Sequence, residues 1–240
     1  MQEGQFVLFV GNLIVNVTVE KNRKLFTLPD ILKNGDENML HLDKDIPVKI
    51  NSDIKIAKAG LKWNADKIDG VAVDLDLFAL GLDSNDKASD DSFCYFGTPH
   101  GIKINDSPYK AVLGDTICVS KDDLTGADVE GDYNENSILK LNTIPENVKA
   151  VVVGVSVYKA KQHFGQVHGA YVDIMNAANE EKFAHYDLSK DMNKGNAIIV
   201  GRFDRLPTGW NFTAIGEEIN GGDSKNAGML ALIKRFGLNP

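Results

Sequence analysis

The residues with the clearest chemical potential lie in one acidic stretch, residues 122–135. It holds six carboxylates, and Gly126 and Gly131 interrupt it. Carboxylates this close repel one another, so without a cation the loop must open or bind protons more tightly. Ca²⁺ removes that conflict, because it takes about six to eight oxygen ligands. The stretch contains no His or Cys, which argues against zinc. It therefore predicts a calcium-binding loop.

A second acidic pair, Asp74 and Asp76, lies inside an apolar run. In an extended strand, alternation places both carboxylates on one face and Val73, Leu75 and Leu77 on the other. Two acids among apolar neighbours are unfavourable unless water or a cation neutralises them. Mg²⁺ fits less well than Ca²⁺, because it usually keeps several waters and seldom uses an all-protein cage. The pair predicts further calcium ligands.

A plainer interpretation stays open at this point. Acidic runs are commonly solvated surface turns, and two aspartates on one strand face can point into water. The loop also lacks the ligand spacing of an EF-hand. His163 and His168 could suggest a zinc or catalytic pair, but their spacing matches no helical ligand motif, and we expect a turn there.

The bulk composition narrows the class of partner. The chain has 240 residues, 43% of them hydrophobic, and a formal net charge of −8. A negative field repels nucleic acid and anionic membranes, so we expect neither as a partner. The apolar residues 6–17 follow no basic region and are too short to span a bilayer, so we expect no membrane insertion. Without an export signal, Cys94 and Cys118 are expected to be reduced, buried thiols of a cytoplasmic protein.

The elements that must position these residues are mostly strands. Apolar runs rich in β-branched residues alternate with turn residues along the chain. Residues 226–236 instead have apolar positions at helical spacing, and Gly237 stands where a C-terminal cap belongs. We therefore expect an all-β fold, a two-sheet β-sandwich with a C-terminal helix. The predicted strands cover residues 5–10, 13–19, 48–50, 54–61, 71–82, 93–96, 138–141, 148–157, 170–175, 198–203 and 210–215.

Five motifs follow one another in a fixed order along the chain. They are Gly60-Leu61-Lys62-Trp63-Asn64, Val73-Asp74-Leu75-Asp76, the acidic loop 122–135, Phe164-Gly165-Gln166-Val167 and Tyr186-Asp187-Leu188-Ser189. Together they resemble the motifs of the TerD family of tellurite-resistance and stress-response proteins. We therefore expect a TerD-like calcium-binding domain at residues 39–240. Residues 1–38 are expected to be an N-terminal extension that forms a β-hairpin around Gly11-Asn12.

The resemblance implies a calcium-binding β-sandwich with no established catalytic activity, in which the Asp-Leu-Asp strand and the acidic loop hold Ca²⁺. This sequence departs from the family pattern at several places, and two of them concern the region of the expected site. Asn64 stands where the family has the Asp of a Trp-Asp pair, and Tyr158-Lys159-Ala160 stands where it usually has His-Asp-Ala. The expected metal ligands are Asp74, Asp76, Asp122, Asp123, Asp132, Asn134 and Glu135.

Three functions fit these residues. The first is a non-enzymatic, calcium-dependent binding or scaffold module in stress response or tellurite resistance, which binds a protein partner or self-associates. The second is a metal-dependent hydrolase of phosphoesters or glycans, which would need an open coordination position and a general base. The third is a structural component of a phage or stress particle, with residues 1–38 as the contact.

Overall fold

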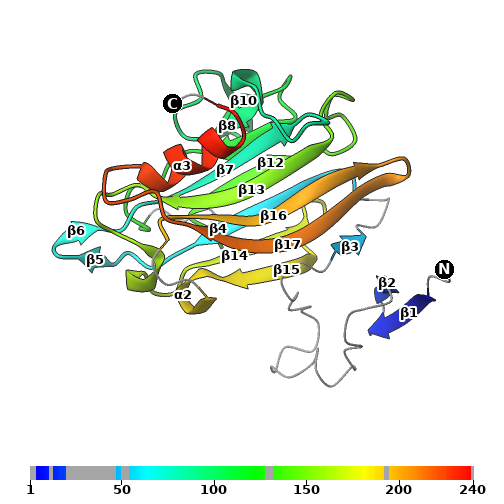
Figure 1. The fold of residues 1–240 in the computed structure, drawn as a ribbon, viewed down its shortest axis with the longest axis horizontal. Helices are drawn as coiled ribbons and strands as arrows, with labels where there is room; N and C mark the ends of the chain where they lie inside the picture. Colours follow the sequence, from blue (N-terminus) through cyan, green and yellow to red (C-terminus); the bar gives the residue numbers. More distant parts are fainter. Residues whose placement is uncertain are drawn as a thin grey trace.

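Two antiparallel sheets stacked face to face make up most of the molecule (Figure 1). The computed structural model describes residues 4–10, 13–19, 47–49, 54–127, 132–191 and 195–238. The seven-stranded sheet has the order β15-β14-β4-β12-β11-β10-β9, and the six-stranded sheet has the order β3-β17-β16-β13-β7-β8. This architecture confirms the predicted all-β sandwich with a C-terminal helix.

The strands of both sheets are short to medium in length. The seven-stranded sheet consists of β15 (Lys182–Asp187), β14 (Tyr171–Asn176), β4 (Ala57–Lys62), β12 (Glu135–Leu139), β11 (Ile117–Ser120), β10 (Ser107–Val112) and β9 (Gly101–Ile104). The six-stranded sheet consists of β3 (Pro47–Lys49), β17 (Gly209–Ile219), β16 (Ala197–Leu206), β13 (Ala150–Val157), β7 (Leu75–Leu82) and β8 (Phe93–Cys94). The remaining elements are β1 (Gly4–Val10), β2 (Leu13–Val19), β5 (Lys67–Ile68), β6 (Val71–Ala72), η1 (Asp90–Ser92), η2 (Phe164–Gln166), α2 (Leu188–Asp191) and α3 (Ala227–Arg235).

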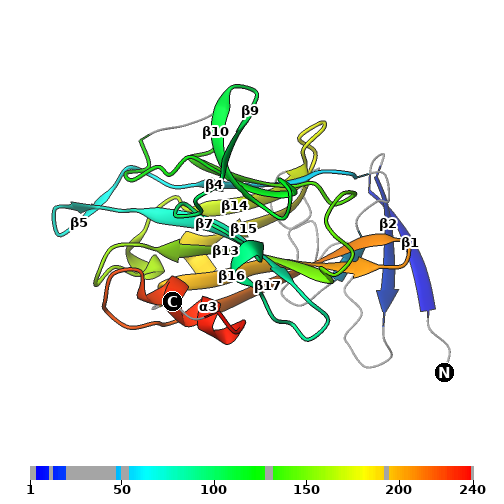
Figure 2. The same cartoon turned by 90° about the horizontal axis from the view of Figure 1, so that it is seen from above.

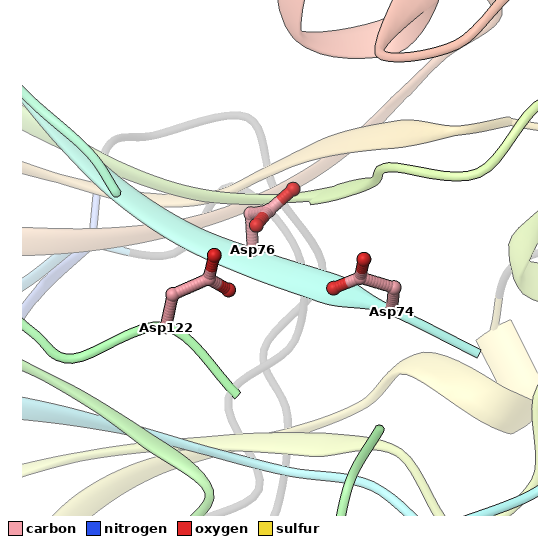
Figure 3. Close-up of side chains that lie close together, drawn as sticks. All are labelled: Asp74, Asp76 and Asp122. Atoms are coloured by element: carbon pink, nitrogen blue, oxygen red, sulfur yellow. The ribbon is translucent and has the colours of Figure 1, made fainter. Parts of the chain in front are cut away.

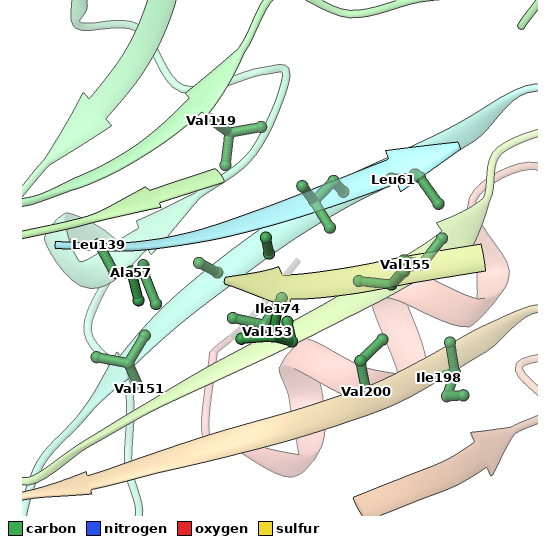
Figure 4. Packing of buried hydrophobic residues seen from close by; sticks show 14 of the residues in the cluster. Ala57, Leu61, Val119, Leu139, Val151, Val153, Val155, Ile174, Ile198 and Val200 are labelled. Carbon is green, nitrogen blue, oxygen red and sulfur yellow. The ribbon is translucent and has the colours of Figure 1, made fainter. Parts of the chain in front are cut away.

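The main core lies between the two sheets. Leu61 and Ile174 enter it from the seven-stranded sheet, and Val153 and Val155 enter it from the six-stranded sheet (Figure 4). These side chains alternate with outward-facing ones along each strand, as the pleat of a β-sheet requires. The core therefore fixes which face of each strand is turned inward.

Helix α3 covers the outer face of the six-stranded sheet (Figure 2). Met229 and Leu232 of the helix pack in one cluster with Phe78 and Val152 of the sheet. The helix ends as predicted, because Gly237 has a φ of 88° and its amide donates to the Lys234 carbonyl at 3.1 Å. Strands β7 and β13 are consequently buried on both faces.

Several strand boundaries differ from the expected ones. The strand predicted at 71–82 is broken: β6 pairs with β5, and β7 begins only at Leu75. Strand β12 begins at Glu135, before the predicted start at residue 138. The predicted strands also omit β5, β9, β10, β11 and β15. Strands β9 and β10 form an edge hairpin with few buried side chains, so their sequences carry little apolar contrast to reveal them.

At the N-terminal side, β1 pairs antiparallel with β2, with Val10 opposite Leu13. The predicted turn at Gly11-Asn12 lies outside the described residues, as does the expected domain boundary at 38/39, so that division stays a prediction. Cys94 and Cys118 are free and buried, as expected. Among the described residues, no helix has the length and apolar character needed to span a membrane.

Candidate metal centre

Three aspartates converge at the start of β7. Asp74 precedes this strand, Asp76 is its second residue, and Asp122 lies in the loop after β11. One carboxylate oxygen of each lies within 4.8 Å of the other two (Figure 3). Across the described part of the chain, this is the one group of three or more Asp, Glu, His or Cys side chains close enough to share a metal ion. Because β7 and β11 belong to different sheets, both sheets contribute to the group.

Strand alternation explains why Asp76 can face a cation while its neighbours pack in the core. Leu75 and Leu77 join the main core between the sheets. Asp76 and Phe78 therefore point to the other face of β7, where Phe78 packs under α3. Asp74 and Asp76 are nevertheless 0% and 2% exposed, so the carboxylates are not simply solvated.

Burial is the main electrostatic influence on this group. It raises the pKa of Asp74, although the Lys159 ammonium acts in the opposite direction. Burial and the charges of Asp74 and Asp122 raise the pKa of Asp76 well above its ordinary value. Burial and the charge of Asp74 likewise raise the pKa of Asp122. Each carboxylate is thus held in a place that disfavours its own charge unless a cation is added.

Several oxygens of the group have no hydrogen-bond donor. Asp74 Oδ1, Asp76 Oδ2 and Asp122 Oδ1 are buried and accept no hydrogen bond in the described structure. Buried carboxylate oxygens are ordinarily paired, so these call for a ligand. A hard dication such as Ca²⁺ takes oxygen ligands of this kind, and the residues present therefore fit it.

Asp123 shapes the acidic loop. Its Oδ1 accepts the amides of Thr125 at 2.9 Å and Gly126 at 3.0 Å, and its Oδ2 accepts Asn134 Nδ2 at 2.9 Å. Gly126 has a φ of 73°, and a Cβ there would lie 2.6 Å from Trp63 Nε1. The loop therefore turns tightly over the indole of Trp63, and only glycine leaves room for that approach.

Glu135 and Asn134 attach the end of the loop to its surroundings. Glu135 Oε2 accepts the amide of Leu77 at 2.7 Å, and its Oε1 accepts the amide of Asp123 at 3.1 Å. Asn134 Oδ1 accepts the amide of Trp63 at 3.0 Å. Burial, together with the charge of Asp76, raises the pKa of Glu135 well above its ordinary value despite these two amides.

The structure thus distributes the seven expected ligands over three kinds of position. Asp74, Asp76 and Asp122 come together in one group. Asp123, Asn134 and Glu135 lie around it and bond to one another, to backbone amides or to both. Asp132 is exposed and lies outside the group of three.

Lys159 belongs to the site although no role was expected for it. Its Nζ lies 2.8 Å from Asp74 Oδ2. The departure at Tyr158-Lys159-Ala160 was visible in the sequence, and a basic residue at the place of the Asp in the resembled His-Asp-Ala pattern is the signal that could have pointed to it. The distance to Asp74 follows only from the fold.

A second polar cluster, on the seven-stranded sheet, was not expected at all. Asp173 is fully buried and accepts Tyr133 Oη at 2.8 Å, while His185 Nδ1 lies 2.6 Å and Lys182 Nζ 2.8 Å from its oxygens. The Tyr133 ring reaches it by crossing Gly60, where a Cβ would lie 2.6 Å from the ring. An isolated Asp in a strand gives no sequence signal of such a network.

The two histidines considered in the sequence do not act as a pair. His163 is the N-cap of η2, which forms the expected turn at the Phe-Gly-Gln-Val motif. His168 Nδ1 lies 3.4 Å from Asp66 Oδ2, and this histidine is exposed. Neither belongs to a metal-ligand group in the described residues.

Fold and site together define a class of protein, a β-sandwich that gathers acidic side chains from both of its sheets. Residues 39–227 match the TerD domain. The chain belongs to the TerD family.

Relatives and solved structures agree with this membership. The chain is 30% identical over 191 residues to the tellurium resistance protein TerD of Serratia marcescens, covering 78% of this chain and 89% of that protein. It is 33% identical over 179 residues to general stress protein 16U of Bacillus subtilis, covering 72% of this chain and 86% of that protein. The crystal structure of a telluride resistance protein (TerD) homologue from Streptomyces coelicolor A3(2) has the same fold. It gives a TM-score of 0.57 at 20% identity and covers 71% of this chain and 92% of that chain.

Proposed function

We propose that the chain is a calcium-binding, non-enzymatic protein of the stress response, of the kind that confers resistance to tellurite or other damaging chemicals. One observation carries the calcium part of this proposal: Asp74 and Asp76, which are buried, and Asp122, which is half-buried, hold buried oxygens that have no donor among the described residues. Asp74, Asp76 and Asp122 would hold the ion, with Asp123, Asn134 and Glu135 keeping the loop in place. Bound Ca²⁺ would neutralise the carboxylates and bridge β7 to the acidic loop.

The physiological part rests on the relatives. Proteins similar to this chain are named for tellurium resistance in Serratia marcescens, general stress in Bacillus subtilis and chemical-damaging agent resistance in Clostridium acetobutylicum. A shared role in tolerating chemical stress is the simplest function compatible with all three names.

A binding or scaffold role explains the site better than catalysis does. The charged groups that act on Asp74, Asp76 and Asp122 in the described structure are other aspartates and lysines, and none is a histidine that could serve as a general base. Leu124, in the acidic loop, is 54% exposed and offers an apolar contact for a protein partner or a second copy. Calcium that orders this loop would also order that contact. The two buried free thiols fit a reducing compartment, and we propose the cytoplasm.

The test is calcium titration of chelator-treated protein by calorimetry, together with thermal unfolding in Ca²⁺ and in Mg²⁺. Ligand that binds only the folded state raises the unfolding temperature by mass action. We expect a calcium-specific rise that Asp76→Asn abolishes. Asp69→Asn is the matched control, because Asp69 is exposed and its φ of 50° suits asparagine. A protein that unfolds at the same temperature with and without Ca²⁺ would refute the proposal.

A further inference from the structure

Lys159 places an ammonium directly against the candidate metal centre. Its Nζ lies 2.8 Å from Asp74 Oδ2, and the Asp74 side chain is 1% exposed. The backbone fixes the lysine there: the Tyr158 amide donates to the Asp74 carbonyl at 2.9 Å, and the Asn226 amide donates to the Tyr158 carbonyl at 2.9 Å. Lys159 Nζ also lies 5.1 Å from the centre of the Tyr158 ring. The cation is therefore a built part of the centre.

The ammonium and a metal ion have the same requirement, the negative charge of Asp74. Two cations on one carboxylate repel each other strongly in a buried place, where water screens little. The formal charges show how the conflict can be resolved. Counted by themselves, the three aspartates carry −3 together, and Lys159 with a single Ca²⁺ balances that charge. Asp76 and Asp122, which have no lysine within ion-pair distance in the described structure, are then the residues best placed to bind the ion.

Resting on the proposed calcium function, we infer that Lys159 competes with Ca²⁺ for Asp74 and thereby lowers the calcium affinity of the centre. In this protein Asp74 is neutralised by the chain itself, and the ion binds mainly to Asp76 and Asp122. Lys159 thus determines how much calcium is needed to fill the site.

The experiment compares calcium affinities of three variants by calorimetry on chelator-treated protein. Lys159→Met keeps an unbranched side chain only one atom shorter and removes its charge, and we expect this variant to bind Ca²⁺ at least about tenfold more tightly than the wild type. Lys159→Arg keeps the charge, and its calcium affinity should stay as low as that of the wild type. Lys182→Met is the matched control, because Lys182 also lies 2.8 Å from a fully buried aspartate, Asp173, but outside the centre.

A double-mutant cycle tests the same inference at Asp74. In the wild-type background, Asp74→Asn should change the calcium affinity little, because the lysine already occupies Asp74. In the Lys159→Met background, the same substitution should lose most of the gained affinity. Unfolding curves without calcium verify that each variant is folded, and Lys159→Gln replaces Lys159→Met should the latter not fold.

The possible outcomes separate the inference from the function on which it rests. Tighter binding by Lys159→Met, with Lys159→Arg and Lys182→Met unchanged, supports the inference. Calcium binding of equal or lower affinity in Lys159→Met overturns the inference and leaves the proposed function intact. No binding by either the wild type or Lys159→Met overturns both.

Discussion

The amide of Leu77 donates a hydrogen bond to Glu135 Oε2 at 2.7 Å and so joins the two sheets beside the candidate metal centre. Strand β8 pairs with β7 only at Ala79 and Leu80, and no other described strand pairs with the first half of β7 on that edge. Glu135, the first residue of β12, fills this place with its side chain. One buried carboxylate thus accepts amides from both β7 and the acidic loop.

Removing this carboxylate should weaken both the fold and the site. Glu135→Ala leaves the buried amides of Leu77 and Asp123 without an acceptor, and we expect a loss of about 2–4 kcal/mol in the free energy of unfolding. Calcium affinity should fall about 10- to 100-fold, as it does when groups that orient metal ligands are removed. Urea unfolding and calorimetry measure the two effects. Glu146→Ala, at an exposed glutamate, is the control and should change neither the free energy of unfolding nor the calcium affinity. Unchanged stability in Glu135→Ala would contradict the proposed link between the sheets.

The structure ranks the expected ligands, and substitutions can check that ranking. Asp76→Asn should reduce calcium affinity at least about tenfold, because Asp76 is buried in the group of three. Asp132→Asn should reduce it less, because Asp132 is exposed and outside that group. Terbium luminescence or calorimetry gives both affinities under identical conditions. A larger effect at Asp132 would show that the loop closes on the ion in a different way.

Asp173 should make the stability of the chelator-treated, metal-free protein sensitive to acid. Burial by itself would raise the pKa of Asp173, but hydrogen bonds from His185, Lys182 and Tyr133 outweigh burial and hold that pKa below its ordinary value. The ionised carboxylate therefore stabilises the folded state above the ordinary aspartate pKa of about 3.9, and this stabilisation is lost as pH falls through the lowered value.

The measurement is the unfolding temperature of wild type and Asp173→Asn between neutral pH and pH values below that of free aspartate. At pH values above the ordinary aspartate pKa, the wild type should unfold at a higher temperature than Asp173→Asn by a constant difference. This difference should shrink as the solution becomes more acidic. Tyr133→Phe removes one of the three donors, and its unfolding temperature should lie between those of the wild type and Asp173→Asn. A margin that does not depend on pH would mean that Asp173 is not held in its charged form.

The packing of the acidic loop on Trp63 can be tested with two glycines of similar conformation. Gly126 has a φ of 73° and faces Trp63, whereas Gly70 has a φ of 79° and a Cβ added there would meet no atom within 4 Å. Alanine at either position meets the strain of a left-handed backbone, about 1–2 kcal/mol. Gly126→Ala should be more destabilising than Gly70→Ala and should shift the Trp63 emission in a Trp210→Phe background. Equal losses of stability in the two variants would show that the Trp63 indole shifts to accommodate the added methyl group at no cost in free energy.

The two cysteines should be inert in the native protein. Burial raises the pKa of Cys94 to about 12 and that of Cys118 to about 11, so almost no thiolate exists at neutral pH. A thiol reagent at mildly alkaline pH should label neither residue until denaturant is added, and both afterwards. Rapid labelling of native protein would show that one of these strands opens readily.

Some features of the protein follow from short stretches of sequence. The alternation in Asp74 to Leu77 separates acids from core side chains, and the apolar spacing before Gly237 determines α3 and its end. Both are local, because strand and helix periodicity act over a few residues. The acidic stretch 122–135 is local too, because its carboxylates and glycines are close neighbours in the sequence.

The tertiary structure alone decided which of these residues meet. Asp122 lies beside Asp74 and Asp76 because β11 and β7 belong to different sheets that pack against each other, and Lys159 lies beside Asp74 because β13 pairs along β7. Sequence cannot give such contacts, since the order and register of strands depend on the burial of the whole core. The same packing makes Glu135, one of the expected ligands, a link between the sheets.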